Sequence, residues 1–317
     1  MTTPDKLQGD EILLGDVADF LEMQLESTDW IIDPFLPAGG RMLLYGETGE
    51  GKSQLAMTAA FAVLQGHKFL QEYQCSKGPV VYIQADMPMQ EWYERLEINT
   101  RALTSMKGLK HVFYPAGLDI IAEAKNSHSQ LAEFIREATP KLVVVDVLSE
   151  THRLDENDNG VPGPVYRAWH AVVGPGAGIL FVHHEKKPQG DFRHNKYAFS
   201  GAHKWLDLSS SSWRVFPKKN KTEIWLENPK AARNAPRMDQ MRLERTPELL
   251  MVKSVGEAVD AWLAKEIEYR RHPKEFLARE AQSLTRWAPG KALSRATVYR
   301  RLEHYSPVSE GETVSRA

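Results

Sequence analysis

The chain has very little cysteine and no long apolar stretch. Cys75 is the single cysteine among 317 residues, which excludes an intramolecular disulfide framework and favours a reducing compartment. No apolar run approaches the roughly 20 residues that a membrane-spanning helix needs. The N-terminal "MTTPDKLQGDE" is polar and acidic, unlike a signal peptide. These absences predict a soluble, cytoplasmic protein that makes no membrane contact.

Net charge is also nearly absent. The formal balance is only -2, so any contact with nucleic acid must come from a local basic patch. The charges are unevenly spread, with eight acids and one base in residues 1–30, and nine bases against two acids in residues 269–301. The two ends of the chain are therefore expected to have different roles.

A glycine-rich loop is the most informative stretch that is present. The segment "YGETGEGKSQL" (45–55) contains the spacing G-x-x-x-x-G-K-[ST], which ends in Lys52 and Ser53. Backbone N–H groups of such a loop hold the β-phosphate of a nucleotide, the lysine reaches the β- and γ-phosphates, and the serine hydroxyl ligates Mg²⁺. ATP and Mg²⁺ are therefore the expected cofactors. The candidate nucleotide-binding residues are Gly46, Glu47, Thr48, Gly49, Glu50, Gly51, Lys52, Ser53 and Gln54.

Two variable positions of this loop are acidic, Glu47 and Glu50. Because the backbone binds the phosphate, both side chains can face outward without touching the anion. One hypothesis is that they meet basic residues of a neighbouring subunit. A solvated loop surface is the simpler alternative.

Apolar runs that alternate with helical spacing indicate the fold class. Buried parallel strands are expected at 41–46, 79–86, 141–146 and 178–184, with helices at 52–65, 90–105, 129–138 and 164–173. This alternation predicts an α/β domain with a mostly parallel sheet. The segments 211–217 and 222–228 are predicted as a strand pair near the sheet edge. The expected domains are an acidic N-terminal arm (1–28) with an amphipathic helix at 12–26, a core (29–245) and a small C-terminal helical domain (246–317).

Polar side chains end three of these strands, where open α/β sheets bind their ligands. Asp146 is the expected Mg²⁺ carboxylate of the Walker B type, with a helix N-cap as the alternative. Asp86 is a candidate to polarise the attacking water, with Glu150 and Glu156 as rivals. His183 ends the strand at 178–184 together with the adjacent histidine.

The order of motifs resembles the RepA-like helicases of plasmids and phages, a branch of the RecA/DnaB-type ATPases. The matching stretches are "GETGEGKS", "VVYIQADMP", "LVVVDVLSETHRLDENDN", "ILFVHHEKK" and "FSGAHKWLD", over about residues 29–235. The resemblance implies a RecA-like core, a ring hexamer, ATP bound between subunits and movement along single-stranded DNA. It also implies that His183 or His184 senses the γ-phosphate. The family usually has glutamate as its catalytic base, where this chain has Asp86.

The resemblance further implies a basic finger that reaches the nucleotide of a neighbouring subunit. An arginine is expected soon after "GAHKWLD", but this chain has serines until Arg214. The segment "NPKAARN" offers Lys230 and Arg233, one residue further apart than the usual pair. Which residue forms the finger is therefore left open among Arg214, Lys230 and Arg233.

A long segment after the histidines, 185–207, is the expected site for single-stranded DNA. Its bases could neutralise phosphates and its aromatic side chains could stack on bases. The alternative is a folded surface loop. The candidate DNA-binding residues are Lys186, Lys187, Arg193, Lys196, Phe199 and Trp205.

The basic C-terminal segment offers a second contact. "ALSRATVYRRLE" (292–303) resembles a recognition helix of a helix-turn-helix or small winged helix, and a packing module is the alternative. It is expected to bind duplex DNA or a replication-initiation partner. Taken together, the sequence favours a DNA-stimulated ATPase, most simply a ring-forming replicative helicase. A nucleotide-gated DNA-binding or helicase-loader protein with slow ATPase is the alternative, and a RecA-like recombinase is a further rival.

Overall fold

The computed structural model describes residues 28–114, 117–185, 203–218, 223–231, 240–254, 305–308 and 313–316. The predicted helix at 12–26 and the predicted recognition helix at 292–303 lie outside the described residues, as does most of the segment expected to bind DNA. The structural statements below concern the described part of the chain.

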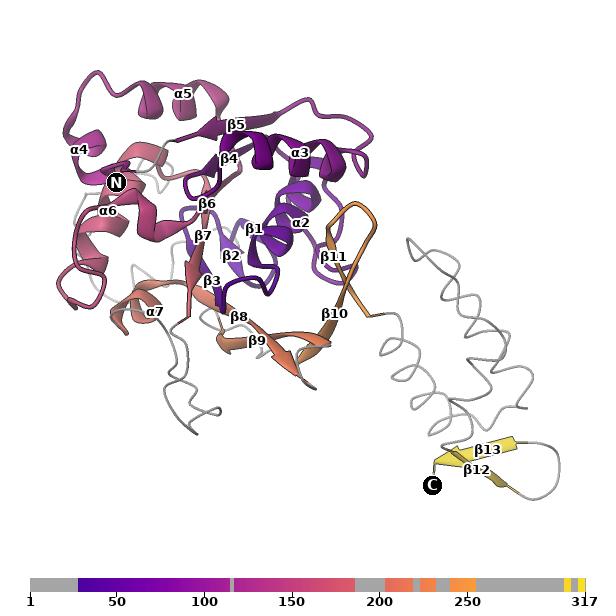
Figure 1. Ribbon diagram of the computed structural model, residues 1–317. Helices are drawn as coiled ribbons and strands as arrows, with labels where there is room; N and C mark the ends of the chain where they lie inside the picture. The colour runs from indigo at the N-terminus through magenta and orange to yellow at the C-terminus, as the bar shows by residue number, and fades with distance from the viewer. Residues whose placement is uncertain are drawn as a thin grey trace, which may run out of the picture.

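A nine-stranded sheet forms the centre of this part (Figure 1). Six strands are parallel: β3 (Arg41–Gly46), β4 (Val80–Gln84), β5 (Leu109–Phe113), β6 (Leu142–Asp146), β7 (Gly178–His184) and β8 (Ser211–Lys218). Three antiparallel strands extend it: β9 (Glu223–Lys230), β10 (Met241–Arg245) and β11 (Met251–Lys253). The strand order is β11-β10-β9-β8-β3-β7-β6-β4-β5.

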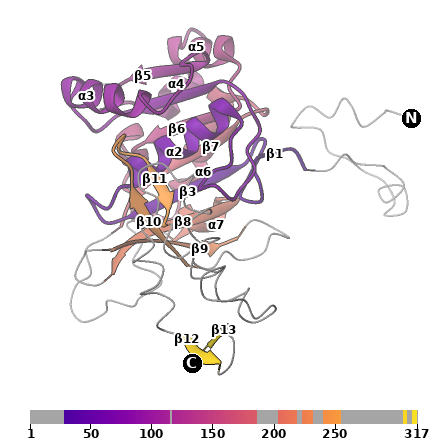
Figure 2. The same ribbon diagram turned by 90° about the vertical axis from the view of Figure 1, so that its right-hand side faces the viewer.

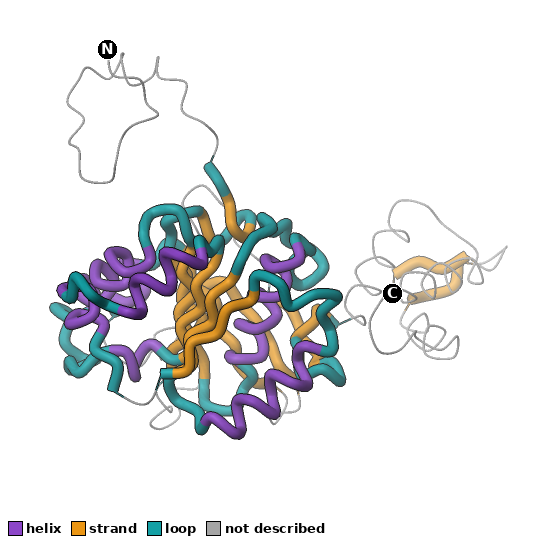
Figure 3. The backbone as a smooth tube through the Cα atoms, turned by 90° about the horizontal axis from the view of Figure 1, so that it is seen from above, coloured by secondary structure: helices purple, strands orange, loops and turns teal. Residues whose placement is uncertain are grey.

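Helices cover both faces of the sheet, as the view from above shows (Figure 3). One face packs against α2 (Lys52–Gln65) and α3 (Met89–Thr100). The other packs against α4 (Ile120–Lys125), α5 (Gln130–Ala138), α6 (Pro162–Val173) and α7 (Lys204–Leu208), with a short 3-10 turn at Leu148–Thr151. Side chains alternate along each strand, so Val144 and Val182 enter the first core layer while Val145 and Phe181 enter the second. Both sheet faces are therefore buried, as the continuous apolar strands require.

Two small antiparallel ribbons stand outside this sheet. β1 (Trp30–Ile32) pairs with β2 (Leu36–Pro37), and β12 (Tyr305–Val308) pairs with β13 (Thr313–Arg316). Among the residues described, no helix has the length and apolar character needed to cross a bilayer.

The helix that follows the glycine loop has clear limits in the sequence. It begins after Gly51 and ends at Gly66, which adopts a left-handed conformation (φ 70°) and donates its N–H to Ala62 O and Val63 O. This is a glycine C-cap that satisfies two terminal carbonyls. The prediction of a helix at 52–65 is confirmed, and β11 lies beside this helix in both Figure 1 and Figure 2.

The expected α/β class with a mostly parallel sheet is confirmed, and β3 and β7 have the predicted bounds. Two expectations are wrong. β8 is not near an edge, because it pairs in parallel with the central strand β3. The core also does not end at residue 245, because β11 pairs with β10 in the same sheet beyond that position. The sequence analysis did not anticipate β5, β10 or β11.

Candidate nucleotide-binding site

A pocket of about 280 Å³ lies where the central strands meet the N-terminus of α2. The glycine loop lines it with Thr48, Gly49, Gly51, Lys52, Ser53 and Gln54. Asp86, Asp146 and His184 line it from the carboxyl ends of β4, β6 and β7. The polar residues that the sequence placed at strand ends are thus brought together, with the exception of His183.

The loop already has the shape of an anion cradle. Lys52 is buried, and its Nζ donates to Gly46 O (3.0 Å) and Glu47 O (2.8 Å), so the ammonium lies inside the loop. Burial lowers the pKa of Lys52, while Asp146 and Asp86 act in the opposite direction. Gly49 and Gly51 have positive φ angles (86° and 92°), the left-handed backbone conformation that occurs in anion-binding nests of successive N–H groups.

Asp146 is held at the bottom of this pocket. It is 2% exposed, and Tyr82 Oη donates to its Oδ2 at 2.7 Å. Burial raises the pKa of Asp146 to about 6, and hydrogen bonds from Tyr82 and Ser53 oppose that rise. Ser53 and Asp146 therefore adjoin, in the arrangement that a Mg²⁺ ion shared with nucleotide phosphates requires.

Asp86 and His184 form a pair at the open side of the pocket. Asp86 Oδ1 accepts a hydrogen bond from Gln84 Nε2 (2.9 Å), and its Oδ2 lies 3.9 Å from His184 Nε2. The other ring nitrogen of His184 lies 3.5 Å from Thr48 Oγ1. Burial, and then Lys52, lower the pKa of His184. The imidazole thus connects the phosphate loop to the acid that was expected to position water.

Three other candidates do not line this pocket. His183 is fully buried on the opposite face of β7, its ring 6.1 Å from that of Trp205, because neighbouring residues of a strand point to opposite faces. Of the two histidines, only His184 lies at the nucleotide site. Glu150 and Glu156 are not among the lining residues either.

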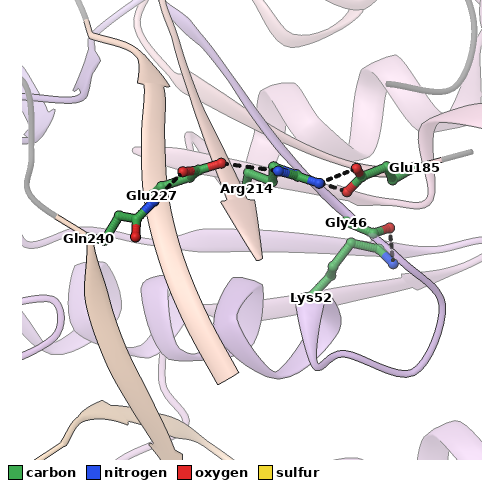
Figure 4. Close-up of polar contacts among 6 residues, drawn as sticks. All are labelled: Gly46, Lys52, Glu185, Arg214, Glu227 and Gln240. Carbon is green, nitrogen blue, oxygen red and sulfur yellow. Dashed lines mark hydrogen bonds and ion pairs between the residues drawn. The ribbon is translucent and has the colours of Figure 1, made fainter. Parts of the chain in front are cut away.

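Arg214 makes a network of ion pairs within its own chain (Figure 4). Its guanidinium contacts both carboxylate oxygens of Glu185 and lies 3.2 Å from Glu227 Oε1. The backbone N–H of Glu185 in turn donates to Gly46 O, and Gln240 Nε2 donates to Glu227 Oε2 (2.7 Å). Arg214 thus pairs with carboxylates of its own chain beside the phosphate loop, and its role as the finger toward a neighbouring subunit stays a prediction.

Lys230 is occupied in the same way. Its Nζ donates to the carbonyls of Leu206, Asp207 and Ser209 at 2.6–2.8 Å, which places an ammonium at the C-terminus of α7. This contact caps α7 within the same chain, and the finger role of Lys230 stays a prediction. Arg233, the remaining candidate, lies outside the described residues.

Trp205 does not present a surface for stacking on DNA bases. It is 0% exposed, with its ring stacked on His152 (5.6 Å) and edge-on to Tyr166 (5.2 Å). The prediction for Trp205 is therefore wrong, since this residue of α7 belongs to the hydrophobic core. The other DNA-binding candidates lie outside the described residues: Lys186, Lys187, Arg193, Lys196 and Phe199.

Two arginines that the sequence motifs did not reveal also line the pocket. Arg95 comes from α3 and lies 3.7 Å from Glu91. Arg245 ends β10 and donates from Nε to Gln54 Oε1 (2.8 Å) and from Nη2 to Gly49 O (3.3 Å). Neither arginine is part of a sequence motif with a recognised spacing, so the sequence contained no signal for it. Tyr82, by contrast, shares a strand face with Gln84, so the alternation of β4 could have identified it.

The residues present fit a nucleotide with Mg²⁺. Within the described chain, no group of three or more His, Cys, Asp or Glu side chains could hold a metal ion by itself. One hydroxyl and one carboxylate suit a Mg²⁺ ion that takes its other ligands from phosphates and water. The cradle around Lys52 suits the phosphates.

Comparison with known proteins agrees with this geometry. A crystal structure of a KaiC-like protein from the hyperthermophilic archaeon Pyrococcus horikoshii is similar, with a TM-score of 0.50 and 13% sequence identity, over 70% of this chain and 93% of that one. At that identity the likeness concerns the fold, which is the RecA-like P-loop fold. P-loop ATPases as a class use ATP and Mg²⁺. The AAA domain family matches residues 9–190, more than half of the sequence, and the chain belongs to that family.

Proposed function

We propose that the chain is an ATP-dependent DNA-binding motor, and specifically a ring-forming replicative helicase that moves along single-stranded DNA. The observation that carries this proposal is the meeting of Lys52, Asp146, Asp86 and His184 in one pocket. A phosphate cradle alone would support binding. A carboxylate paired with a histidine at its open side supports hydrolysis.

Each of these side chains has a distinct task in the proposed reaction. Lys52 leaves its two carbonyl partners and stabilises charge on the β- and γ-phosphates, while Ser53 and Asp146 hold Mg²⁺. Asp86 orients the attacking water, and its 36% exposed side chain leaves room for that water. His184, which lies beside Asp86, responds to the loss of the γ-phosphate after hydrolysis.

The proposal for DNA rests on the position of these residues in the chain. His184 stands two residues before Lys186, where the segment rich in bases and aromatics begins. A change at the histidine therefore has a short covalent path to that segment. The bases would neutralise DNA phosphates, and Phe199 would stack on a base.

A slow, nucleotide-gated DNA-binding or loader protein is the second candidate. It is favoured by one observation. The side chain of Asp86 is one methylene shorter than that of glutamate, and its carboxylate already accepts a hydrogen bond from Gln84 and lies beside His184. Such a carboxylate would orient water less freely. The protein would then bind ATP tightly and hydrolyse it slowly.

Turnover measurements separate these functions. ATPase rates with and without single-stranded DNA, together with unwinding of a forked duplex, are expected to show stimulation and strand separation. Lys52→Ala should abolish turnover, and Asp86→Asn should lower kcat far more than nucleotide affinity. Stimulation without unwinding would favour the loader. Turnover that survives Lys52→Ala would reject the nucleotide site.

Assembly needs its own test. Arg233→Ala protein lacks the proposed finger, and Lys52→Ala protein lacks the phosphate lysine, so a mixture of the two should recover some ATPase at shared interfaces. Electron microscopy with an ATP analogue and single-stranded DNA should show a closed ring. A monomer under these conditions, with no recovery in the mixture, would reject the ring.

A further inference from the structure

Arg245 touches the phosphate loop at a place that the other polar residues leave alone. Lys52 contacts Gly46 O and Glu47 O. Arg245 instead contacts Gly49 O and the side chain of Gln54, so it approaches a different part of the same loop.

The β10–β11 hairpin is seated on this part of the loop. A Cβ atom added at Gly51 would lie 2.1 Å from Met251 Cε and 3.6 Å from Arg245 Nη2. Met251 N also donates to Thr58 Oγ1 on α2 at 2.8 Å, which anchors β11 beside the helix. The guanidinium of Arg245 is therefore held next to the cradle by a strand of the sheet rather than by a loop.

The charge of Arg245 is not neutralised within the described chain. None of the ion pairs found there includes Arg245, and its two partners are a backbone carbonyl and an amide oxygen. Arg242 on the same strand differs, because it pairs with Glu223 (3.6 Å) and Glu244 (3.2 Å). A guanidinium without a carboxylate, at the rim of an anion cradle, favours a phosphate as its ligand.

We propose that Arg245 is a nucleotide-binding residue that the chain supplies to its own site. On binding, its guanidinium leaves Gly49 O and Gln54 for the phosphates nearer the ribose, away from the γ-phosphate served by Lys52. Because ATP and ADP share those phosphates, the contact is equal for substrate and product, and it contributes affinity rather than rate. This inference rests on the proposed nucleotide site but not on DNA binding or unwinding.

Direct binding of ADP and of a non-hydrolysable ATP analogue to the full chain tests this proposal. Arg245→Ala should raise both dissociation constants by a similar factor, about 10- to 100-fold, the loss expected for a hydrogen bond to a charged group. KM for ATP should rise with little change in kcat. Arg245→Lys keeps the charge and the fold but loses the planar guanidinium, so its affinity for nucleotide should lie between those of the wild type and Arg245→Ala. Arg242→Ala, on the same strand and outside the pocket, should bind both nucleotides as the wild type does.

A mixing experiment tests whether the residue acts within one chain. A mixture of Arg245→Ala and Lys52→Ala proteins should show no more ATPase than the separate proteins at subsaturating ATP. Recovery of activity would place Arg245 in a neighbour's site and overturn the proposal. Unchanged affinity, or a fall in kcat alone, would overturn it as well. Failure of the wild type to hydrolyse ATP would reject the proposed function while leaving the binding comparison valid.

Discussion

Replacing Arg214 by alanine should destabilise the fold more than the loss of a surface ion pair would. Glu185 has a side chain that is 2% exposed, and Arg214 (17% exposed) supplies its ion pair among the described residues. Without the guanidinium, a buried carboxylate is left without the cation that pairs with it. The loss of one partner of a buried pair costs about 3–5 kcal/mol, against a total stability of about 5–15 kcal/mol for a typical domain.

The cost should depend on pH in a defined direction. Burial raises the pKa of Glu185, and Arg214 opposes this rise. In Arg214→Ala the opposition is lost, so the folded-state pKa rises further above the unfolded value of about 4.3. Between those two values the folded protein binds the proton more tightly, and the free energy of unfolding therefore increases as pH falls. The deficit should be largest at pH 8 and smaller at pH 5.5.

Urea denaturation of the full chain at both pH values measures this effect. The double variant Glu185→Gln/Arg214→Met, which buries no unpaired charge at position 185, should be more stable than Arg214→Ala. Arg242→Ala, which breaks two more exposed ion pairs, should cost only about 1 kcal/mol. A deficit below about 1 kcal/mol for Arg214→Ala, or one that does not change with pH, would refute the reasoning.

Four other perturbations have defined outcomes. Gly46→Ala would put a Cβ atom 2.2 Å from the carbonyl oxygen of Val215 in the neighbouring strand, so it should destabilise more than Gly49→Ala, where only the positive φ costs about 1–2 kcal/mol; equal denaturation midpoints would contradict the clash. Trp205→Ala should cost about 3–5 kcal/mol as a core truncation, and a neutral result would restore it as a surface residue. Lys230→Met should lower stability by about 1–3 kcal/mol through loss of charged hydrogen bonds to α7, measured by the same denaturation. Removal of residues 255–317 should leave basal ATPase intact while lowering affinity for forked DNA in a binding titration; loss of both would make that segment structural.

The parts of the fold that the sequence predicted are those with strong local signals. The glycine spacing, the apolar strands and Gly66 each specify local conformation, and β3, β7 and α2 occur where expected. β5 was missed because its residues are only partly buried at the sheet edge and show no apolar run. The placement of β8 next to β3 is a long-range pairing, which no local pattern encodes.

The candidate site shows the same division. Lys52, Ser53 and Asp146 belong to motifs, and the structure brings them into one pocket. The choice between His183 and His184 depends on which face of β7 meets α2, so it needed the tertiary structure. Trp205 was misjudged because an aromatic residue that would stack on a base has the same composition signal as one that fills a core.

The basic residues show why charge in a sequence is a weak guide to partners. Arg214 and Lys230 were two of the three candidates for a finger, and within this chain one neutralises Glu185 and the other caps α7. Lys230 joins β9 to α7. Arg214 joins Glu227 on β9 to Glu185, and Arg245 joins β10 to the phosphate loop itself. The backbone N–H of Glu185 donates to Gly46 O at one end of the loop, and Arg245 Nη2 donates to Gly49 O near its middle. Arg214 and Arg245 therefore support the loop from outside its motif, so substitutions at these two positions should alter nucleotide binding while the motif itself stays intact.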